Sequence, residues 1–188
     1  MKIIKILLVL AILFISVSAV SAEGNFTALQ EEIDSSTDFL EITQDYVYDN
    51  STDYELIKGI NITKNDFTIN GNGHTIDASN QARIFGIRGD NITILNLTFI
   101  NGYTNKGGGA ILSERNVNLI DCLFENNTAE IGGAVCFINE TENIRISSVF
   151  NKNTATELGG AICFLSNTEY NTIESTFENN KAAYGGAI

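Results

Sequence analysis

A repeated tetrapeptide, Gly-Gly-Ala followed by Ile or Val, constrains the fold of this 188-residue chain more than any other feature. Its Ala residues are 24, 27 and 26 residues apart, and its copies begin at Gly108, Gly132, Gly159 and Gly185. A second motif, Phe-x-x-Asn, keeps constant phase with the first and begins at Phe124, Phe150 and Phe177, with a weaker copy at Phe99. Two motifs in phase over four copies indicate a solenoid, in which each unit buries its apolar face against the next.

A repeat of this length is compatible with two kinds of solenoid coil. Leucine-rich repeats require the pattern Leu-x-x-Leu-x-Leu, which none of the copies contains. A parallel β-helix requires about three short strands and three turns in each coil, and the segments before each Phe are rich in β-branched residues. We therefore predict an all-β chain folded as a parallel β-helix.

Each motif position has a predicted role in such a coil. Phe and Ile are expected to point into the bore and to stack on their equivalents one coil away. Asn at the turn tolerates a left-handed backbone and can bond to the Asn of the neighbouring coil. Gly-Gly allows a sharp corner where a Cβ would clash, and the Ala that follows suits the narrow end of the bore.

Three segments are predicted along the chain. Residues 1–22 have the form of a secretory signal peptide, because Lys2 and Lys5 precede an apolar run and Val20-Ser21-Ala22 fits the cleavage rule. Residues 23–38 are predicted to form a helical cap and residues 39–188 the β-helix. The sequence ends at Ile188 in mid-repeat, so we expect either a piece of a longer product with further repeats or a partner that caps this end.

The cap is predicted as one helix over residues 25–33. Thr27 with Gln30 three residues later has the form of a capping box, and Phe26, Leu29 and Ile33 fall on one helical face. Beyond the cap, short alternating patterns predict strands, which lie at residues 39–43, 59–63 and 67–70.

Composition narrows the classes of function. The net charge is −12 and Lys plus Arg is only 11, which argues against nucleic acid or an anionic membrane as a partner. There is one His, so a His-dependent triad or a multi-His metal site is not expected. His74 has no acidic cluster beside it in the sequence, and Arg83-Ile-Phe85 departs from the Arg-x-Lys of galacturonan hydrolases. We therefore expect no enzyme, and no catalytic, cofactor-binding or metal-binding residue.

One run of carboxylates needs a separate account. The densest run of acidic residues consists of Asp45, Asp49, Asp53 and Glu55. Its two interpretations are a Ca²⁺ site, since this cation binds several oxygen ligands, and a solvated acidic loop. The run matches neither an EF-hand loop nor the Gly-Gly-x-Gly-x-Asp calcium repeat, and the solvated loop is the preferred interpretation.

The three cysteines fall on repeat positions. Cys136 and Cys163 occupy the same slot, held by Leu112 in the first copy, and Cys122 occupies a slot held by Ser in later copies. We predict buried free thiols within a small inward stack, because in-register parallel strands give poor disulfide geometry. A Cys136–Cys163 bridge is the alternative.

Two further groups of residues concern the surface. Six tyrosines are either scattered exposed side chains or contacts for sugars and proteins, and they are Tyr46, Tyr48, Tyr54, Tyr103, Tyr170 and Tyr184. Seven Asn-x-Ser/Thr sequons arise by chance or accept glycans, and they begin at Asn25, Asn50, Asn61, Asn91, Asn96, Asn126 and Asn139.

At these residues the chain resembles two groups of surface proteins. The Gly-Gly-Ala-Ile and Phe-x-x-Asn pair resembles the repeats of the chlamydial polymorphic outer membrane proteins. The segment Asn-Gly-Asn-Gly-His-Thr-Ile-Asp-Ala, at residues 70–78 after a signal peptide and short helix, is similar to adhesin-like surface proteins of methanogenic archaea. The resemblance covers residues 24–188. It implies a right-handed parallel β-helix, of the pectin lyase-like kind, in an exported protein with an adhesive or structural role.

The sequence thus predicts an extracellular, cell-surface β-helix that attaches to cells or to surface polysaccharides. Its expected partners are glycans or proteins on other cells, with no nucleic acid, no membrane insertion after signal cleavage and no cofactor. One alternative is a carbohydrate-active, pectate lyase-like enzyme whose catalytic coils lie outside this segment, and another is a non-functional fragment.

Overall fold

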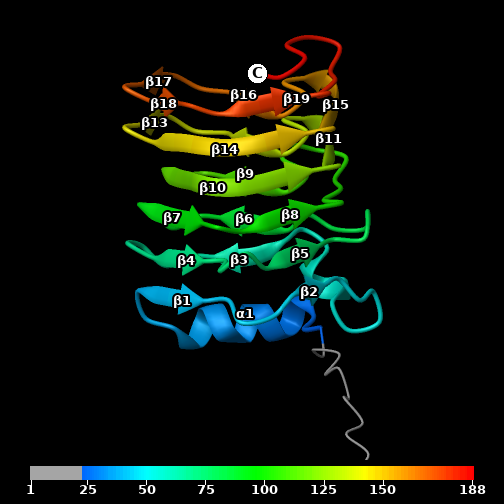
Figure 1. Cartoon of the computed structure of the whole chain (residues 1–188), viewed down its shortest axis with the longest axis vertical. Coiled ribbons are helices and arrows are strands. Elements are labelled where there is room, and N and C mark those ends of the chain that lie inside the picture. The colour runs from blue at the N-terminus through cyan, green and yellow to red at the C-terminus, as the bar shows by residue number, and fades with distance from the viewer. Residues whose placement is uncertain (1–22) are drawn as a thin grey trace, which may run out of the picture.

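The computed structural model describes residues 23–188, which fold into a parallel β-solenoid of about five turns with one short helix (Figure 1). The predicted signal peptide, residues 1–22, lies outside the described residues. Every pairing between the named strands is parallel, and the prediction of a parallel β-helix with an N-terminal helix is confirmed.

One sheet forms the long face of the solenoid. Its first half contains β1 (Phe39–Glu41), β4 (Thr68–Asn70), β7 (Ile92–Leu95), β10 (Val117–Glu125), β14 (Arg145–Asn151) and β18 (Thr172–Ile173). Beyond a bend the sheet continues through β2 (Tyr46–Val47), β5 (Thr75–Asp77), β8 (Thr98–Ile100), the ends of β10 and β14, and β19 (Thr176–Glu178). The bend lies within β10, where the register shifts between Ile120 and Leu123.

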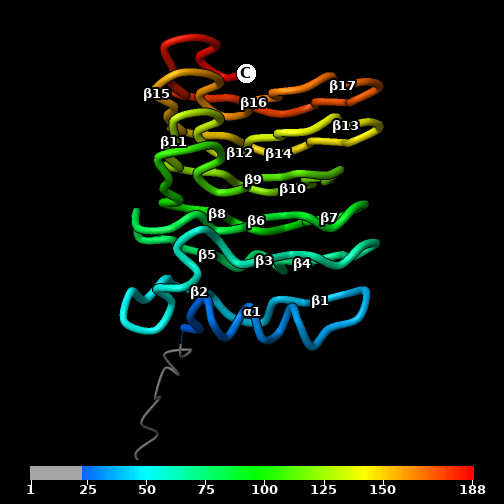
Figure 2. Tube along the Cα trace, turned by 180° about the vertical axis from the view of Figure 1, so that it is seen from behind, coloured from blue at the N-terminus to red at the C-terminus, as the bar shows by residue number. Residues whose placement is uncertain are grey.

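A second sheet closes the bore from behind (Figure 2). It consists of β3 (Ile60–Ile62), β6 (Phe85–Ile87), β9 (Ile111–Ser113), β12 (Val135–Phe137) and β16 (Ile162–Phe164). Two smaller ladders complete the later coils, one of β11 (Thr128–Ile131) with β15 (Thr154–Leu158) and one of β13 (Thr141–Glu142) with β17 (Thr168–Glu169). A 3₁₀ turn, η1 (Tyr54–Leu56), lies in the long loop after β2.

The bore is filled by like residues stacked on like. Phe99, Phe124, Phe150 and Phe177 form one column, and their successive ring centroids are 4.6, 4.7 and 5.1 Å apart with nearly parallel planes. This distance is the spacing of adjacent strands, so each ring lies directly over its equivalent. The predicted inward Phe column is confirmed.

The Asn of Phe-x-x-Asn forms a buried ladder between coils. Asn127 donates from its backbone N–H and from Nδ2 to Oδ1 of Asn153, and Asn153 donates in the same way to Asn180. Each Nδ2 also donates to the carbonyl oxygen of the Phe in the preceding coil. The predicted ladder is confirmed, but the left-handed backbone belongs to the preceding residue, Asn126, Lys152 or Asn179.

Gly-Gly forms the predicted corner, and its two glycines serve different purposes. The first, for example Gly132 with a φ of +60°, adopts the left-handed conformation. At the second, a Cβ on Gly133 would overlap the carbonyl oxygen of Gly160 in the next coil. One glycine therefore permits the turn and the other permits the coils to approach.

The helix α1 (Phe26–Ser35) covers the first coil, with Phe26, Leu29 and Ile33 buried as predicted. The predicted capping box at Thr27 is wrong, because the N-cap lies two residues earlier, at Asn25, whose side chain accepts from Ala28 N–H at 2.9 Å. Thr27 donates instead to the buried carboxylate of Asp53, from both its N–H and its hydroxyl. Asp53 also accepts from the N–H groups of Phe26 and Asp49, so it ties the helix to the loop after β2.

The ladder gives a first prediction. Asn153→Ala should lower the free energy of unfolding by about 3 kcal/mol, because the buried N–H and Nδ2 of Asn127 and the carbonyl oxygen of Phe124 each lose a hydrogen-bond partner. Asn167→Ala is the matched control, since Asn167 is exposed and no side-chain hydrogen bond of it is seen in residues 23–188. Urea unfolding followed by circular dichroism measures both, and equal stability of the two variants would contradict the ladder's role.

Asp53 gives a second prediction. Asp53→Ala should lower the free energy of unfolding by about 3 kcal/mol, because five donors at the helix start and in the loop after β2 lose a charged acceptor. The control is Asp38→Ala, since Asp38 is exposed and accepts only from Thr37 among side-chain partners. Limited proteolysis should cut the Asp53→Ala variant between α1 and β1 faster than the control. Cleavage at the same rate in both would show that Asp53 does not hold the helix in place.

Candidate functional site

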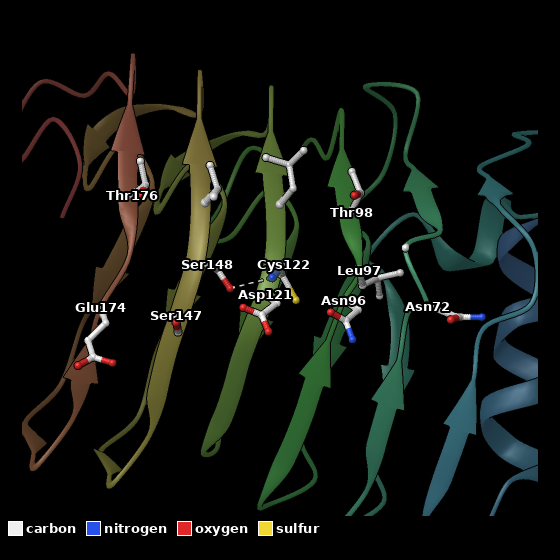
Figure 3. Close-up of a pocket in the computed structure, with 13 residues that line it drawn as sticks. Asn72, Asn96, Leu97, Thr98, Asp121, Cys122, Ser147, Ser148, Glu174 and Thr176 are labelled. Atoms are coloured by element: carbon white, nitrogen blue, oxygen red, sulfur yellow. Dashed lines mark hydrogen bonds between the residues drawn. The ribbon is translucent and has the colours of Figure 1, made fainter.

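A polar groove crosses the coils at the bend of the long sheet (Figure 3). It encloses about 720 Å³ and is open to solvent. The backbone at the bend is left-handed at Asn96 and Asp121, with φ of +51° and +52°, so their side chains turn outward. The residues lining the groove are Asn72, Gly73, Asn96, Leu97, Thr98, Asp121, Cys122, Leu123, Ser147, Ser148, Val149, Glu174 and Thr176.

The groove presents hydroxyl, amide and carboxylate groups in a row, one coil after another. Figure 3 shows Asp121, Ser147 and Glu174 on three successive coils. At about 4.8 Å per coil, Asp121 and Glu174 belong to strands about 10 Å apart. The arrangement is suited to hydrogen bonding along an extended ligand.

The acidic run proposed from the sequence is dispersed in the fold. Asp45 contacts His74, with 3.0 Å between Oδ1 and Nδ1, and also accepts from Thr75 N–H. Asp49 is exposed, and hydrogen bonds from the hydroxyl and N–H of Ser51 lower its pKa. Asp53 is buried under the helix, so the prediction of a solvated loop is wrong for it. Among residues 23–188, His, Cys, Asp and Glu side chains form no group of three placed to hold a metal ion.

Arg83 has a role that the sequence did not indicate. It is 6% exposed, and its guanidinium donates to the carbonyl oxygens of Gly108, Lys58 and Gly107 at 2.8 to 2.9 Å. These carbonyls belong to the preceding and following coils, so Arg83 joins three coils. Its contacts within residues 23–188 include no carboxylate. It therefore brings an uncompensated positive charge into the wall of the solenoid.

The cysteines divide into two kinds. Cys122 lies in the bore as predicted, and its N–H donates to the hydroxyl of Ser148 at 3.1 Å (Figure 3). Cys136 and Cys163 are register partners as predicted, but they lie on β12 and β16 between residues that face the bore, so they point outward. The prediction of an inward stack is wrong for these two. Cys136 is nevertheless fully buried, because Gly107 of the loop after β8 lies against its sulfur.

All three cysteines are free thiols. Burial raises the pKa of Cys122 to about 11 and that of Cys136 to about 12, and it also raises the pKa of Cys163. Since the thiolate is the reactive form, these thiols are poor nucleophiles at neutral pH.

The tyrosines also divide. Tyr46 and Tyr48 are core residues, so the prediction of surface tyrosines is wrong for them. Burial and a hydrogen bond to Glu32 raise the pKa of Tyr46 to about 12, and Tyr48 packs edge-on against Phe26. Four tyrosines are exposed, as the sequence allowed, and they are Tyr54, Tyr103, Tyr170 and Tyr184. Six of the seven sequon asparagines are exposed, whereas Asn25 is half-buried at the helix cap.

Comparison with known proteins identifies the repeat. Three segments, residues 121–138, 147–165 and 174–188, match the Chlamydia polymorphic membrane protein repeat. The chain therefore carries these repeats. The matched segments contain the ends of β10 and β14 and all of β11, β12, β15, β16 and β19. No curated protein and no solved structure matches the chain. Within residues 23–188, none of the helices is long and apolar enough to cross a membrane.

The thiols give a third prediction. A thiol reagent such as dithionitrobenzoate should react with none of the three cysteines in the folded chain at pH 8 within minutes, because they are buried and protonated. In denaturant without reductant, all three should react at once. Reaction of a single thiol under those conditions would reveal a disulfide and contradict the free-thiol arrangement.

Proposed function

We propose that this chain is an exported surface protein whose solenoid has a structural role and attaches to cells or to surface polysaccharides. The observation that carries the proposal is the match of three segments to a repeat of polymorphic membrane proteins, on coils whose strands pair in parallel. The name of the repeat family supports a surface location.

The outward faces of the coils supply the binding surface. Along a strand, side chains alternate between bore and solvent, so outward residues recur one coil apart in straight columns. One such column on the long sheet offers hydroxyl, amide and guanidinium groups, and it consists of Thr68, Thr93, Asn118, Arg145 and Thr172. An extended polymer lying across the coils would meet a donor or acceptor about every 4.8 Å.

Binding is favoured over catalysis by the groove at the bend. Its two carboxylates, Asp121 and Glu174, are two coils apart. The one thiol that lines the groove, Cys122, is buried, and burial raises its pKa. A surface that gains affinity from many weak contacts needs neither a strained residue nor an activated nucleophile.

The fourth prediction tests this function. Fluorescent beads coated with the chain should attach saturably to cell surfaces or to films of purified polysaccharide, and heat-unfolded chain should not support attachment. Beads coated with serum albumin are the control for nonspecific adhesion. Loss of polymer length on incubation with the chain would indicate an enzyme, and absence of saturable attachment to every surface tested would overturn the proposal.

A further inference from the structure

We propose that a second cavity, on the outer side of β3, β6 and β9, binds a uronate-containing saccharide. This inference rests on the proposed function and names the chemistry of its ligand. The cavity encloses about 630 Å³, within the roughly 300–1,000 Å³ typical of small-molecule sites. It lies where the loop after β2 and the loop after β8 border the back sheet, and both loops project on the same side of the solenoid (Figures 1 and 2).

Gly86 forms the floor of this cavity. It is the middle residue of β6 and faces outward, between Asn61 of β3 and Leu112 of β9. A Cβ placed there would meet nothing closer than 3.8 Å, so neither the backbone nor a neighbouring coil requires glycine at this position. A glycine inside a strand weakens it and often marks a place where a ligand approaches the backbone. The missing side chain is therefore what leaves the cavity open.

The walls concentrate positive charge in an acidic protein. Four of the chain's 11 Lys and Arg residues line the cavity, whereas the net charge of the chain is −12. They are Lys58, Arg83, Arg88 and Lys106. Of the two carboxylates in the lining, Glu114 is already paired with Arg88, with 3.0 Å between Oε1 and Nε. The remaining cations exceed the remaining carboxylate, Glu55, so the cavity attracts an anion.

Arg83 is the fixed member of this group. Its carbonyl partners hold it in one position and leave its charge unneutralised, as described above. A pre-positioned guanidinium beside a cavity loses little side-chain entropy when it meets a carboxylate. Lys58 and Lys106 are exposed and can adjust to the ligand from the two loops.

The neutral residues favour a saccharide over a small inorganic anion. Asn61, Gln81, Thr104 and Asn105 offer amide and hydroxyl groups for sugar hydroxyls, and Tyr103, 45% exposed, offers an aromatic face for the apolar side of a pyranose ring. Cations, amides and one aromatic around a single cavity match the three kinds of group on a uronate: carboxylate, hydroxyl and C–H.

The test compares two strand substitutions of equal size. Gly86→Leu fills the cavity, and Thr156→Leu places the same side chain on an exposed position of β15, away from the cavity. Both variants should fold, since Leu is tolerated better than Gly in a strand. The protein is produced without N-glycosylation, because Asn61 begins a sequon within the cavity. Calorimetric titration uses tetragalacturonate, with maltotetraose and inorganic phosphate as reference ligands.

Tetragalacturonate should bind the wild-type chain and the Thr156→Leu variant alike, and Gly86→Leu should weaken binding by more than about tenfold. Lys106→Gln should weaken it by about threefold, and the charge-matched control Lys152→Gln should leave it unchanged. Equal binding of maltotetraose would overturn the role of the carboxylate. Equal competition by phosphate would show that the cavity is a general anion site and would overturn the proposal that its ligand is a saccharide.

The bead assay separates this inference from the proposed function. Wild-type chain that attaches to cells or polysaccharide films but binds no tetragalacturonate would overturn the cavity site and leave the proposed function standing. Failure of both measurements would overturn both. Binding of tetragalacturonate that survives Gly86→Leu would place the saccharide elsewhere on the solenoid and overturn the cavity site.

Discussion

The structure depends on one constraint, that each coil must match the next in parallel register. Backbone hydrogen bonds, the Phe column and the Asn ladder all run between equivalent positions about one strand spacing apart. A charged residue in such a column would face its like one coil away, so the interior columns consist of apolar residues with a few neutral polar ones, such as Asn127, Asn153 and Ser148. The second glycine of a corner, for example Gly133, satisfies the same constraint, because its missing Cβ leaves room for a carbonyl oxygen of the next coil.

Because like stacks on like, the fold is visible in the sequence as a period. Phe-x-x-Asn and Gly-Gly-Ala-Ile could be assigned to bore, turn and corner before any coordinates, and the structure confirms these assignments. The helix face of Phe26, Leu29 and Ile33 was equally predictable from spacing. The N-cap was not, because both Asn25 and Thr27 have capping side chains, and the choice is made by Asp53, which lies far away in the sequence and takes the hydroxyl of Thr27.

The features that escaped prediction are those that occur once. Burial of Tyr46 and Asp53 depends on how α1 lies across the first coil, and a short local pattern carries no record of that packing. The outward direction of Cys136 could not be predicted for another reason. The loop after β8 covers this outward position, so a small apolar residue occupies it just as one would occupy a core position. Gly86 and the basic cavity could have been found only by noticing that one outward strand position lacks the side chain its neighbours in the column possess.

The division between repeated and unrepeated features also bears on function. Repeated coils supply a rigid frame, and loops held on a rigid frame are where binding residues usually lie. The basic cavity lies in the less regular coils, between the loops after β2 and β8, whereas the segments that match the repeat begin beyond it. On a chain with net charge −12, the acidic remainder repels a polyanion and the cavity attracts it, so the field of the molecule itself directs an acidic polymer to one place. That attraction acts through solvent and weakens as salt shortens the screening length, whereas the contacts of Gly86 and Tyr103 with a sugar ring do not depend on charge.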